Sequence, residues 1–322
     1  MIIPKETIYK IIYYGNRAPS SHNAQMWKVF QRKDSELEIR INEEKILPYV
    51  DPLNREAWIS IGAFVQNCIL AAADLGVKVD VDFKDNFVLL RFDTSKALYT
   101  YPFIPLIEKR QTVRNTFTNN KNNSSKINRI ISDEKEILFC DIKSDLATKI
   151  KNLAIQSFTQ QLNNPNKLNE LAEWSSFSTD IVKKEGISSF CMGLSWIERF
   201  VCSMTKSEKF MKTSFFKSGA IRSFKKQLKS CSGYVLITSD KNSKYAWFQA
   251  GRILQRFWLN CTANSLVVHP FSQLIEEENY YDKLKNLLEN DKEVQLLLRI
   301  GNVRKLNPFY SSRREMSEVI TQ

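Results

Sequence analysis

Strand-like alternation of apolar and polar residues recurs along the chain. The pattern is clearest over 35–41 and 77–83, where every second residue is apolar, the period of a half-buried strand. Shorter apolar runs bounded by polar turns predict further strands. One predicted strand begins at 27–30. The others are 35–41, 77–83, 86–92, 137–142, 234–238, 266–269 and 294–300.

Much of the remaining sequence has apolar residues at the spacing of a helix. In the segment 56–75, Phe64, Cys68 and Leu75 are predicted to form one apolar stripe, with Gly76 as a C-cap just past the helix end. The predicted helices are 5–14, ending at Gly15, 56–75, one after the polar stretch 121–128, a long one at 144–172, 245–263 and 279–289. This mixture predicts an α+β fold.

Two of the predicted helices carry the same motif. The pattern A-W-x-x-x-G-x-x-x-Q-x-x-x-L covers 57–70 and recurs at 246–259, a constant offset of 189. Gly62, Gln66 and Leu70 are spaced by four, so they share one helix face. Chance similarity between two amphipathic helices is one explanation. Internal duplication is the other, and it predicts two related halves that face one another, with a site that takes residues from both.

Small counts of particular residues exclude several enzyme classes. The chain has 9 glycines, too widely spaced for a G-x-G-x-x-G or Walker phosphate loop. The 2 histidines, His22 and His269, exclude H-E-x-x-H and three-histidine metal sites. The 6 cysteines form no C-x-x-C pair, and Cys68 and Cys261 lie in apolar helical segments. We therefore expect neither a metal site nor a disulfide framework.

The N-terminal sequence MIIPKETIYK lacks the basic and apolar regions of a signal peptide. No run in the sequence approaches the roughly 18 consecutive apolar residues of a membrane helix. The expected location is a reducing cytoplasm.

The chain is basic, with 47 Lys and Arg against 35 Asp and Glu, a net charge of +12. Much of the excess lies in 199–229, which has nine Lys or Arg, one Glu and several interleaved phenylalanines. Three interpretations stay open. The first is a solvated face of helices whose phenylalanines point inward. The second is a surface that contacts nucleic acid or an anionic membrane. The third is a basic entrance that steers phosphate-bearing molecules.

Two segments carry the residue types that suit a phosphate-bearing aromatic cofactor. RAPSSHNAQMW at 17–27 is a loop that displays hydroxyls and amides before a strand. RQTVRNTF at 110–117 places Arg110 and Arg114 four residues apart, with Thr112 between them. We expect the two arginines to share one helix face, where two guanidinium groups beside a hydroxyl suit a phosphate monoester. A polar cap and a solvated basic turn are the simpler interpretations of these two segments.

Together the two segments resemble motifs of the nitroreductase superfamily of FMN-dependent oxidoreductases. RAPSSHNAQMW resembles the family's APSxxNxQPW loop, with Met26 in place of proline, and RQTVRNTF resembles its RRSxRxF phosphate motif. GAFVQNCILAAADLG at 62–76 resembles a family helix, and LLLRIGNV with the later Ser-Ser-Arg-Arg resembles its closing strand and basic tail. The motif order and the repeat resemble the fused, single-chain Acg-type branch.

The resemblance implies a nitroreductase-like α+β fold in two pseudo-symmetric halves, 1–105 and 106–322, the second with a basic helical lid at about 174–232. One FMN is then expected between the halves, with NADPH or NADH as reductant and a monomer acting as a pseudo-dimer. Arg110, Thr112 and Arg114 would hold the phosphate, assisted by Arg313 or Arg314. The side chains expected at the ribityl chain and the isoalloxazine are Ser20, Ser21, Asn23 and Gln25.

The function implied is ping-pong hydride transfer from NAD(P)H through the flavin to a small aromatic or quinone-like acceptor. No side-chain nucleophile is required, and no catalytic acid or base is assigned. The alternative is a non-catalytic protein that binds or sequesters flavin under a closed lid.

Overall fold

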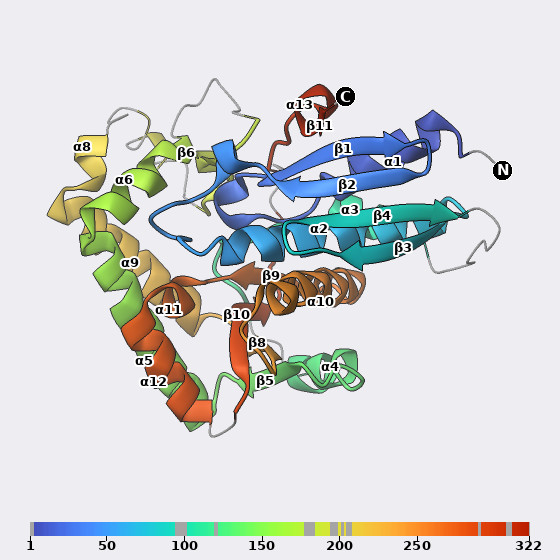
Figure 1. Cartoon of the computed structure of the whole chain (residues 1–322). Helices are drawn as coiled ribbons and strands as arrows, with labels where there is room; N and C mark the ends of the chain where they lie inside the picture. Colours follow the sequence, from blue (N-terminus) through green and yellow to red (C-terminus); the bar gives the residue numbers. More distant parts are fainter. Residues whose placement is uncertain are drawn as a thin grey trace. The chain divides into compact units, whose positions relative to one another are not determined.

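The computed structural model describes residues 3–93, 102–118, 122–176, 184–193, 199–200, 203, 208–288, 291–306 and 311–321. They divide into two compact units built from interleaved segments (Figure 1). The first unit comprises Met1–Arg110, Ser243–Leu259 and Ser312–Gln322, and the second comprises Gln111–Asn242 and Asn260–Ser311. The first unit thus takes in three segments of the predicted second half, 106–110, 243–259 and 312–322, and the origin of the halves by duplication stays a prediction.

The first unit contains a five-stranded sheet of order β11-β1-β2-β4-β3. Its strands β1 (Trp27–Lys33), β2 (Glu36–Ile41), β4 (Phe87–Asp93) and β3 (Lys78–Phe83) pair antiparallel, as the alternating sequence predicts. β11 (Ile320–Thr321) joins the edge parallel to β1, with Val29 opposite Ile320. The sequence of the polar tail does not predict this last strand. It follows the one-turn helix α13 (Met316–Val319), whose N-terminus has a Glu315–Glu318 capping box.

The helices of the first unit are α1 (Lys5–Gly15), α2 (Arg55–Asp74), α3 (Ile104–Lys109) and the greater part of α10 (Lys244–Ala263). α2 is long and apolar enough to cross a membrane, with a mean hydropathy of 1.3, but 89% of that window is buried inside the structure. It is therefore the core helix of this unit. Phe64 and Cys68 are buried as predicted, whereas Leu75 is 36% exposed because it caps the helix instead of continuing its stripe.

The two copies of the repeated motif pack on one another within the first unit. A Cβ built on Gly62 of α2 would lie 2.0 Å from the carbonyl oxygen of Phe248, and one on Gly251 of α10 would lie 1.9 Å from that of Ile59. Ile59 and Phe248 are themselves 189 residues apart, so the contact is reciprocal. A reciprocal contact of this kind is the hallmark of an isologous interface.

The second unit contains a four-stranded antiparallel sheet of order β5-β8-β10-β9. Its strands are β5 (Ile137–Asp141), β8 (Gly233–Ser239), β10 (Glu293–Gly301) and β9 (Val267–Pro270), close to the predicted ranges. β8 is buried along six of its seven residues, which fits its continuous apolar sequence.

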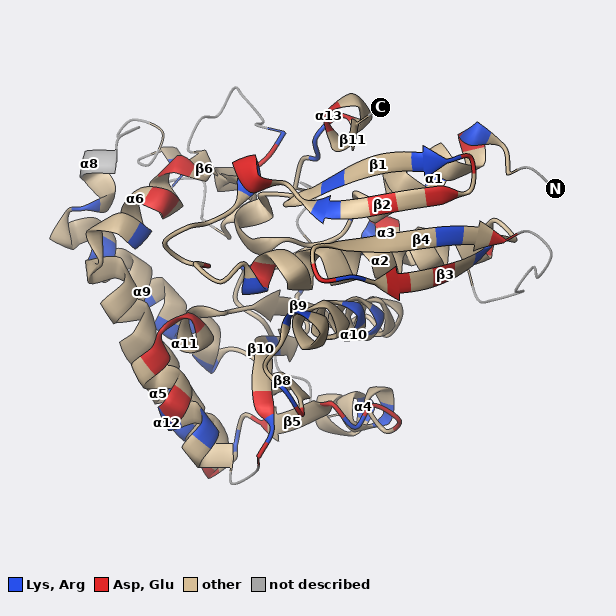
Figure 2. Ribbon diagram, viewed as in Figure 1, with Lys and Arg blue, Asp and Glu red and all other residues tan. Residues whose placement is uncertain are grey.

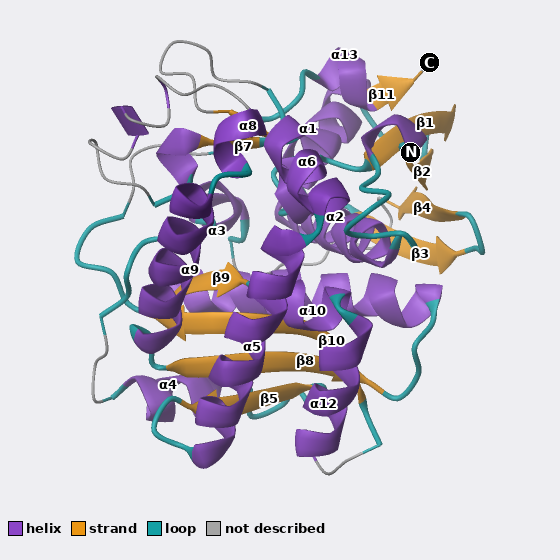
Figure 3. Cartoon of the chain, turned by 90° about the vertical axis from the view of Figure 1, so that its left-hand side faces the viewer, coloured by secondary structure: helices purple, strands orange, loops and turns teal. Residues whose placement is uncertain are grey.

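Helices cover one face of this sheet, as Figure 3 shows for α5 (Asp145–Asn163), α9 (Ser214–Lys229) and α12 (Glu278–Leu288). Ala147 and Ile150 of α5, Leu228 of α9 and Leu284 of α12 share a buried core with Leu297 of β10. The unit also contains α4 (Asn123–Ile130), α6 (Pro165–Glu173), α8 (Glu208–Met211), α11 (Gln273–Glu276), β6 (Ser175–Ser176) and β7 (Ile187–Ser188). Helices together with a mixed five-stranded sheet and an antiparallel four-stranded sheet confirm the α+β class.

The single long helix predicted at 144–172 is wrong, because the segment forms two helices. α5 ends at Asn163, and Asn164 adopts an extended conformation whose side chain caps α6. Pro165 explains the break, since a proline disfavours helical backbone at the residue before it. Of the predicted lid at 174–232, the described residues include β6, β7, α8 and α9; its action as a lid stays a prediction.

Candidate functional site

The loop between α1 and β1 has an unusual backbone. His22, Asn23 and Gln25 all have positive φ, at 49°, 55° and 55°, although none is glycine. Non-glycine residues in this region are strained and persist only where their surroundings fix them. Such concentrated strain is typical of a functional loop, and it falls in the segment that the sequence singled out.

Side chains from the loop itself fix this conformation. Asn23 donates through Nδ2 to the Ser312 carbonyl at 3.1 Å, and its Oδ1 accepts from Arg313 at 2.9 Å. Gln25 accepts through Oε1 from the Arg314 amide at 2.8 Å, and its own backbone amide donates to Ser20 Oγ at 2.9 Å. The amides of Asn23 and Gln25, predicted as cofactor contacts, thus hold the loop to the C-terminal segment.

Arg313 and Arg314, in the C-terminal segment, bind the same loop through their own side chains. Arg313 makes five hydrogen bonds, which equals the donor capacity of a guanidinium: to Asn23 Oδ1 and to the carbonyls of Asn16, Arg17, Ala18 and Ser312. Arg314 is 5% exposed and donates to the carbonyls of Gln25, Trp27 and Glu318. Arg313 can therefore give a ligand its positive charge but no further hydrogen bond.

Arg110 leaves part of its hydrogen-bonding capacity unused. It lies at the C-cap of α3, is 5% exposed, and stacks 4.7 Å from the ring centre of Trp258. Nη2 donates to the Arg17 carbonyl at 2.9 Å, while the buried Nε and Nη1 have no partner among the described residues. Burial, with Arg313 and Arg17 nearby, lowers the pKa of Arg110 to about 9. An unpartnered buried guanidinium is chemically suited to an anion, which would supply the missing acceptors.

Arg17 belongs to the same group and was not assigned by sequence reasoning. Its Nη2 donates to the Tyr13 hydroxyl at 3.1 Å, and its guanidinium carbon lies 5.3 Å from the Tyr13 ring centre. Its Nε is buried and has no partner in the described part of the chain. The signal was available, because Arg17 opens the quoted loop just after Gly15, where the helix ends.

Thr112 and Arg114 lie in the second compact unit, which begins at Gln111, whereas Arg110 belongs to the first. The prediction that Arg110 and Arg114 share a helix face is wrong, because α3 ends at Lys109 and the following residues are not helical. β-branched Thr112 and Val113 favour extended backbone, and the Val113 amide donates to the Val268 carbonyl at 3.5 Å. Arg114 is half-buried, and its Nη1 donates to the Cys191 carbonyl at 3.0 Å.

A second basic group surrounds His269 in this unit. Arg299 is 1% exposed, lies 3.9 Å from the ring centre of Phe117, and donates through Nε to His269 Nδ1 at 3.0 Å. Burial and the charges of Arg299 and Arg114 hold the pKa of His269 well below its usual value. A neutral imidazole that accepts at Nδ1 carries its proton on Nε2, so His269 presents a donor.

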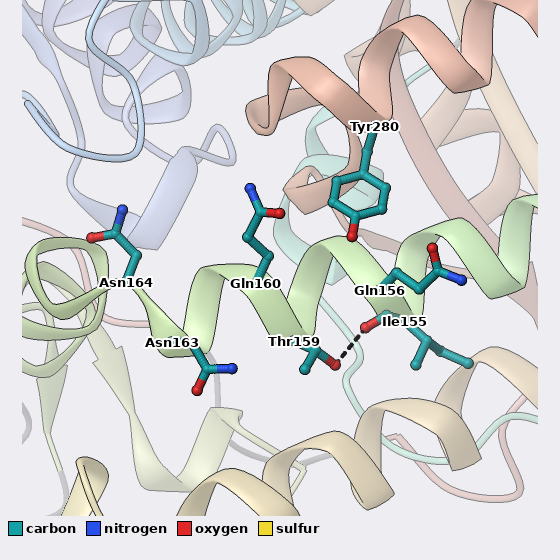
Figure 4. A pocket seen from close by; sticks show the side chains of 7 residues that line it. All are labelled: Ile155, Gln156, Thr159, Gln160, Asn163, Asn164 and Tyr280. Carbon is teal, nitrogen blue, oxygen red and sulfur yellow. Dashed lines mark hydrogen bonds between the residues drawn. The ribbon is translucent and has the colours of Figure 1, made fainter.

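The surface groove of the second unit does not contain the predicted site residues (Figure 4). It has a volume of about 640 Å³ and lies along α5 beside Tyr280 of α12. Amides dominate its lining: Gln156, Gln160, Asn163 and Asn164, with Ile155, Thr159 and Tyr280. Several of these amides already bind neighbours, such as Gln160 to Glu277 and Asn163 to Lys217.

Metal and thiol chemistry find no support among the described residues. They contain no group of three or more His, Cys, Asp or Glu side chains placed to hold a metal ion. Burial raises the pKa values of the Cys68 and Cys261 thiols, which keeps them protonated. These cysteines act as small apolar core residues.

No family model matches the chain, and no curated protein matches it. Similar solved structures include the FMN- and NADPH-dependent nitroreductase NfnB from Sphigopyxis sp. strain HMH, with 14% identity and a TM-score of 0.43 over 68% of this chain and 98% of that chain. The FMN-dependent nitroreductase NfnB from Mycobacterium smegmatis, solved with NADPH, has 11% identity and a TM-score of 0.41 over 66% of this chain and 94% of its own. A nitroreductase with bound FMN from Bacteroides fragilis has 10% identity and a TM-score of 0.37, over 67% and 95%.

All three of these proteins are nitroreductases, the family whose motifs this sequence resembles.

Proposed function

We propose that the protein is an FMN-dependent NAD(P)H oxidoreductase of the nitroreductase type, which passes hydride to a small aromatic or quinone-like acceptor. The observation that carries the proposal is Arg110, a buried guanidinium with two unpartnered nitrogens beside two further arginines. A phosphate monoester supplies the missing acceptors and up to two negative charges.

The residues present fit the phosphate end of FMN. Arg110 and Arg17 would donate to the phosphate oxygens, and Arg313 would add charge while it fixes the loop. The resemblance to the family motif implies that Thr112 and Arg114 would hold the same phosphate. The strained loop, with Ser20 and the Ser21 hydroxyl, would face the rest of the cofactor, and Asn23 and Gln25 would act by positioning it.

The flavin, when bound, supplies hydride chemistry in which it is alternately reduced and oxidised. The chain's own contribution is to bind, orient and surround it. Arg110 and its neighbours provide a positive field, and burial strengthens that field because less water screens it. No acid or base is needed for these roles.

The phosphate assignment is tested by comparing FMN with riboflavin, which lacks the phosphate. We expect Arg110→Met to weaken FMN binding by about a hundredfold, since two charge-assisted hydrogen bonds are lost, and to leave riboflavin binding unchanged. The control is Arg129→Met, an exposed arginine on α4. Wild-type protein that binds FMN no better than riboflavin would contradict the proposal.

A further measurement separates an enzyme from a flavin store. NADPH and NADH are added anaerobically to the FMN-loaded protein, and the flavin absorbance is followed. Bleaching by either nucleotide, then reoxidation by a quinone or nitroaromatic, is expected of the oxidoreductase. Loaded protein that neither nucleotide bleaches is the non-catalytic flavin-binding alternative.

The proposal includes duplication of a homodimer-like half, so one chain forms one site. The reciprocal packing of Gly62 and Gly251 supports it, because a helix crossing between two identical subunits has this symmetry. Flavin titration should then give one FMN per chain, with the protein a monomer on size-exclusion chromatography.

A further inference from the structure

The exposed side of α9 carries a set of unpaired positive charges, which we name the α9 basic face: Arg222, Lys225, Lys226 and Lys229. All four are exposed, and none forms an ion pair with a described residue. From 210 to 233 the sequence contains no Asp or Glu. Figure 2 shows basic positions without acidic ones along this helix. The positive charge of this surface is therefore not neutralised locally.

The opposite side of α9 is fixed to its own unit. Phe224 and Leu228 are 7% and 0% exposed and belong to the core that α9 shares with α5 and the sheet. The phenylalanine-inward interpretation of this segment is thus correct for Phe224. The basic face remains the side of the helix that is turned to solvent.

The spacing of the basic face is unfavourable for a helix that stands alone. Arg222 and Lys226, and likewise Lys225 and Lys229, are like charges four residues apart, an arrangement that destabilises a helix. Lys226 and Lys229 gain in part from the helix C-terminus. Exposed faces elsewhere in the unit mix signs, as α12 does with Asp282 and Lys283. A negative partner would relieve the repulsion on α9.

An exposed aromatic residue stands at the other end of the same helix. Phe215, in the first turn, is 74% exposed, and its ring centre lies 6.4 Å from that of Phe210. From Phe215 to Lys229 the helix extends about 21 Å, at 1.5 Å per residue. An apolar tip followed by a basic face fits a surface that offers negative headgroups and an apolar layer together.

We propose that the α9 basic face and Phe215 bind the surface of a bilayer rich in anionic phospholipid. Arg222, Lys225, Lys226 and Lys229 contact the headgroups, and Phe215 enters the region just beneath them. A nucleic acid backbone satisfies the charges but offers Phe215 no apolar layer. The contact is peripheral and reversible, and it is independent of the proposed flavin function.

The test is co-sedimentation of the full chain with phosphatidylcholine vesicles that contain either no phosphatidylserine or about 30% of it. Binding is expected only with phosphatidylserine, and it should fall steeply between about 50 mM and about 300 mM NaCl. Each basic residue near the surface contributes about fivefold to partitioning, so K225Q/K226Q should bind about thirtyfold more weakly.

Controls distinguish this surface from general positive charge. K143Q/K241Q removes the same charge from lysines outside α9 and should bind like wild type. Phe215→Ser should weaken binding while it keeps the salt dependence. Circular dichroism and a thermal melt verify that each variant is folded.

Three results would overturn the proposal: equal binding to vesicles with and without phosphatidylserine, equal losses in K225Q/K226Q and K143Q/K241Q, or binding to a DNA strand or duplex with no binding to vesicles.

Discussion

Gly62 and Gly251 each lie against the backbone of the other's helix, and neither position has room for a side chain. A Cβ atom would come within 2.0 Å of a carbonyl oxygen at Gly62 and within 1.9 Å of one at Gly251, much closer than any real contact. The helices must therefore move apart to accept even a methyl group.

Gly62→Ala and Gly251→Ala are each expected to destabilise the protein by about 1–3 kcal/mol or more, because overpacking is relieved only by backbone shifts. Gly219→Ala is the matched control. Gly219 lies within α9 with no atom close to its Cβ position, so the change should stabilise by about 0.5–1 kcal/mol. Chemical denaturation measures all three. Equal effects at the three positions would show that the crossing is not tight.

Arg110→Met is expected to raise the melting temperature of the flavin-free protein while it weakens FMN binding. The buried charge has no anionic partner among the described residues, and its neighbours Arg17 and Arg313 repel it. Methionine keeps part of the packing against Trp258 without that cost, so a gain of about 1 kcal/mol is expected. Differential scanning fluorimetry without and with FMN measures both effects. A lower melting temperature without FMN would mean that Arg110 is structural.

Arg313→Lys should loosen the strained loop although it preserves the charge. An ammonium group has three donors, whereas Arg313 makes five hydrogen bonds. We expect a loss of about 2 kcal/mol in stability and faster hydrogen exchange at 16–25. Arg304→Lys, at an exposed arginine, is the control. Unchanged exchange at 16–25 in Arg313→Lys would show that the tail does not hold the loop.

Asp51 predicts a pH dependence of stability. It is 4% exposed, and burial, reinforced by Glu56, raises its pKa from 3.8 to about 7. Between these pH values the folded state binds more protons than the unfolded state. The contribution of Asp51 to the free energy of unfolding therefore falls as pH rises from about 4 to about 7.

In Asp51→Asn the side-chain oxygen can still accept from the Ala57 amide, as Asp51 does at 3.0 Å, but the group no longer titrates. Its melting temperature should decline less than that of wild type between about pH 5 and about pH 7.5. Asp34→Asn, at an exposed turn, should follow wild type. Parallel profiles for wild type and Asp51→Asn would remove Asp51 as the cause.

Periodicity predicted most strands and helices because their apolar residues face a core, and the burial of β8 and α2 agrees with it. It failed at Asn164, where the apolar pattern continues but Pro165 breaks the helix. It also missed β11, since two residues are too few to show a period. The pairing of β11 with β1 depends on tertiary contacts.

The candidate site was predictable in composition but not in roles. The motif identified Arg110 and the loop residues, yet Asn23 and Gln25 bind the chain's own tail. Sequence spacing cannot show that Arg313 uses all five donors, or that Arg110 leaves two nitrogens without a partner among the described residues, because most of the partners involved are about 100 to 300 residues away. Arg17 was overlooked although it opens the same loop, because the resemblance to the family motif assigned it no role.

The attachment of residues 312–314 to the loop at 16–25 has a consequence for the order of events during synthesis. Its hydrogen bonds join residues 289 to 298 positions apart. The strained loop therefore has no fixed shape while the ribosome is still translating the middle of the chain. The loop side of the proposed FMN site is completed only after Arg314 has left the exit tunnel, so we expect FMN to bind after this segment has been made.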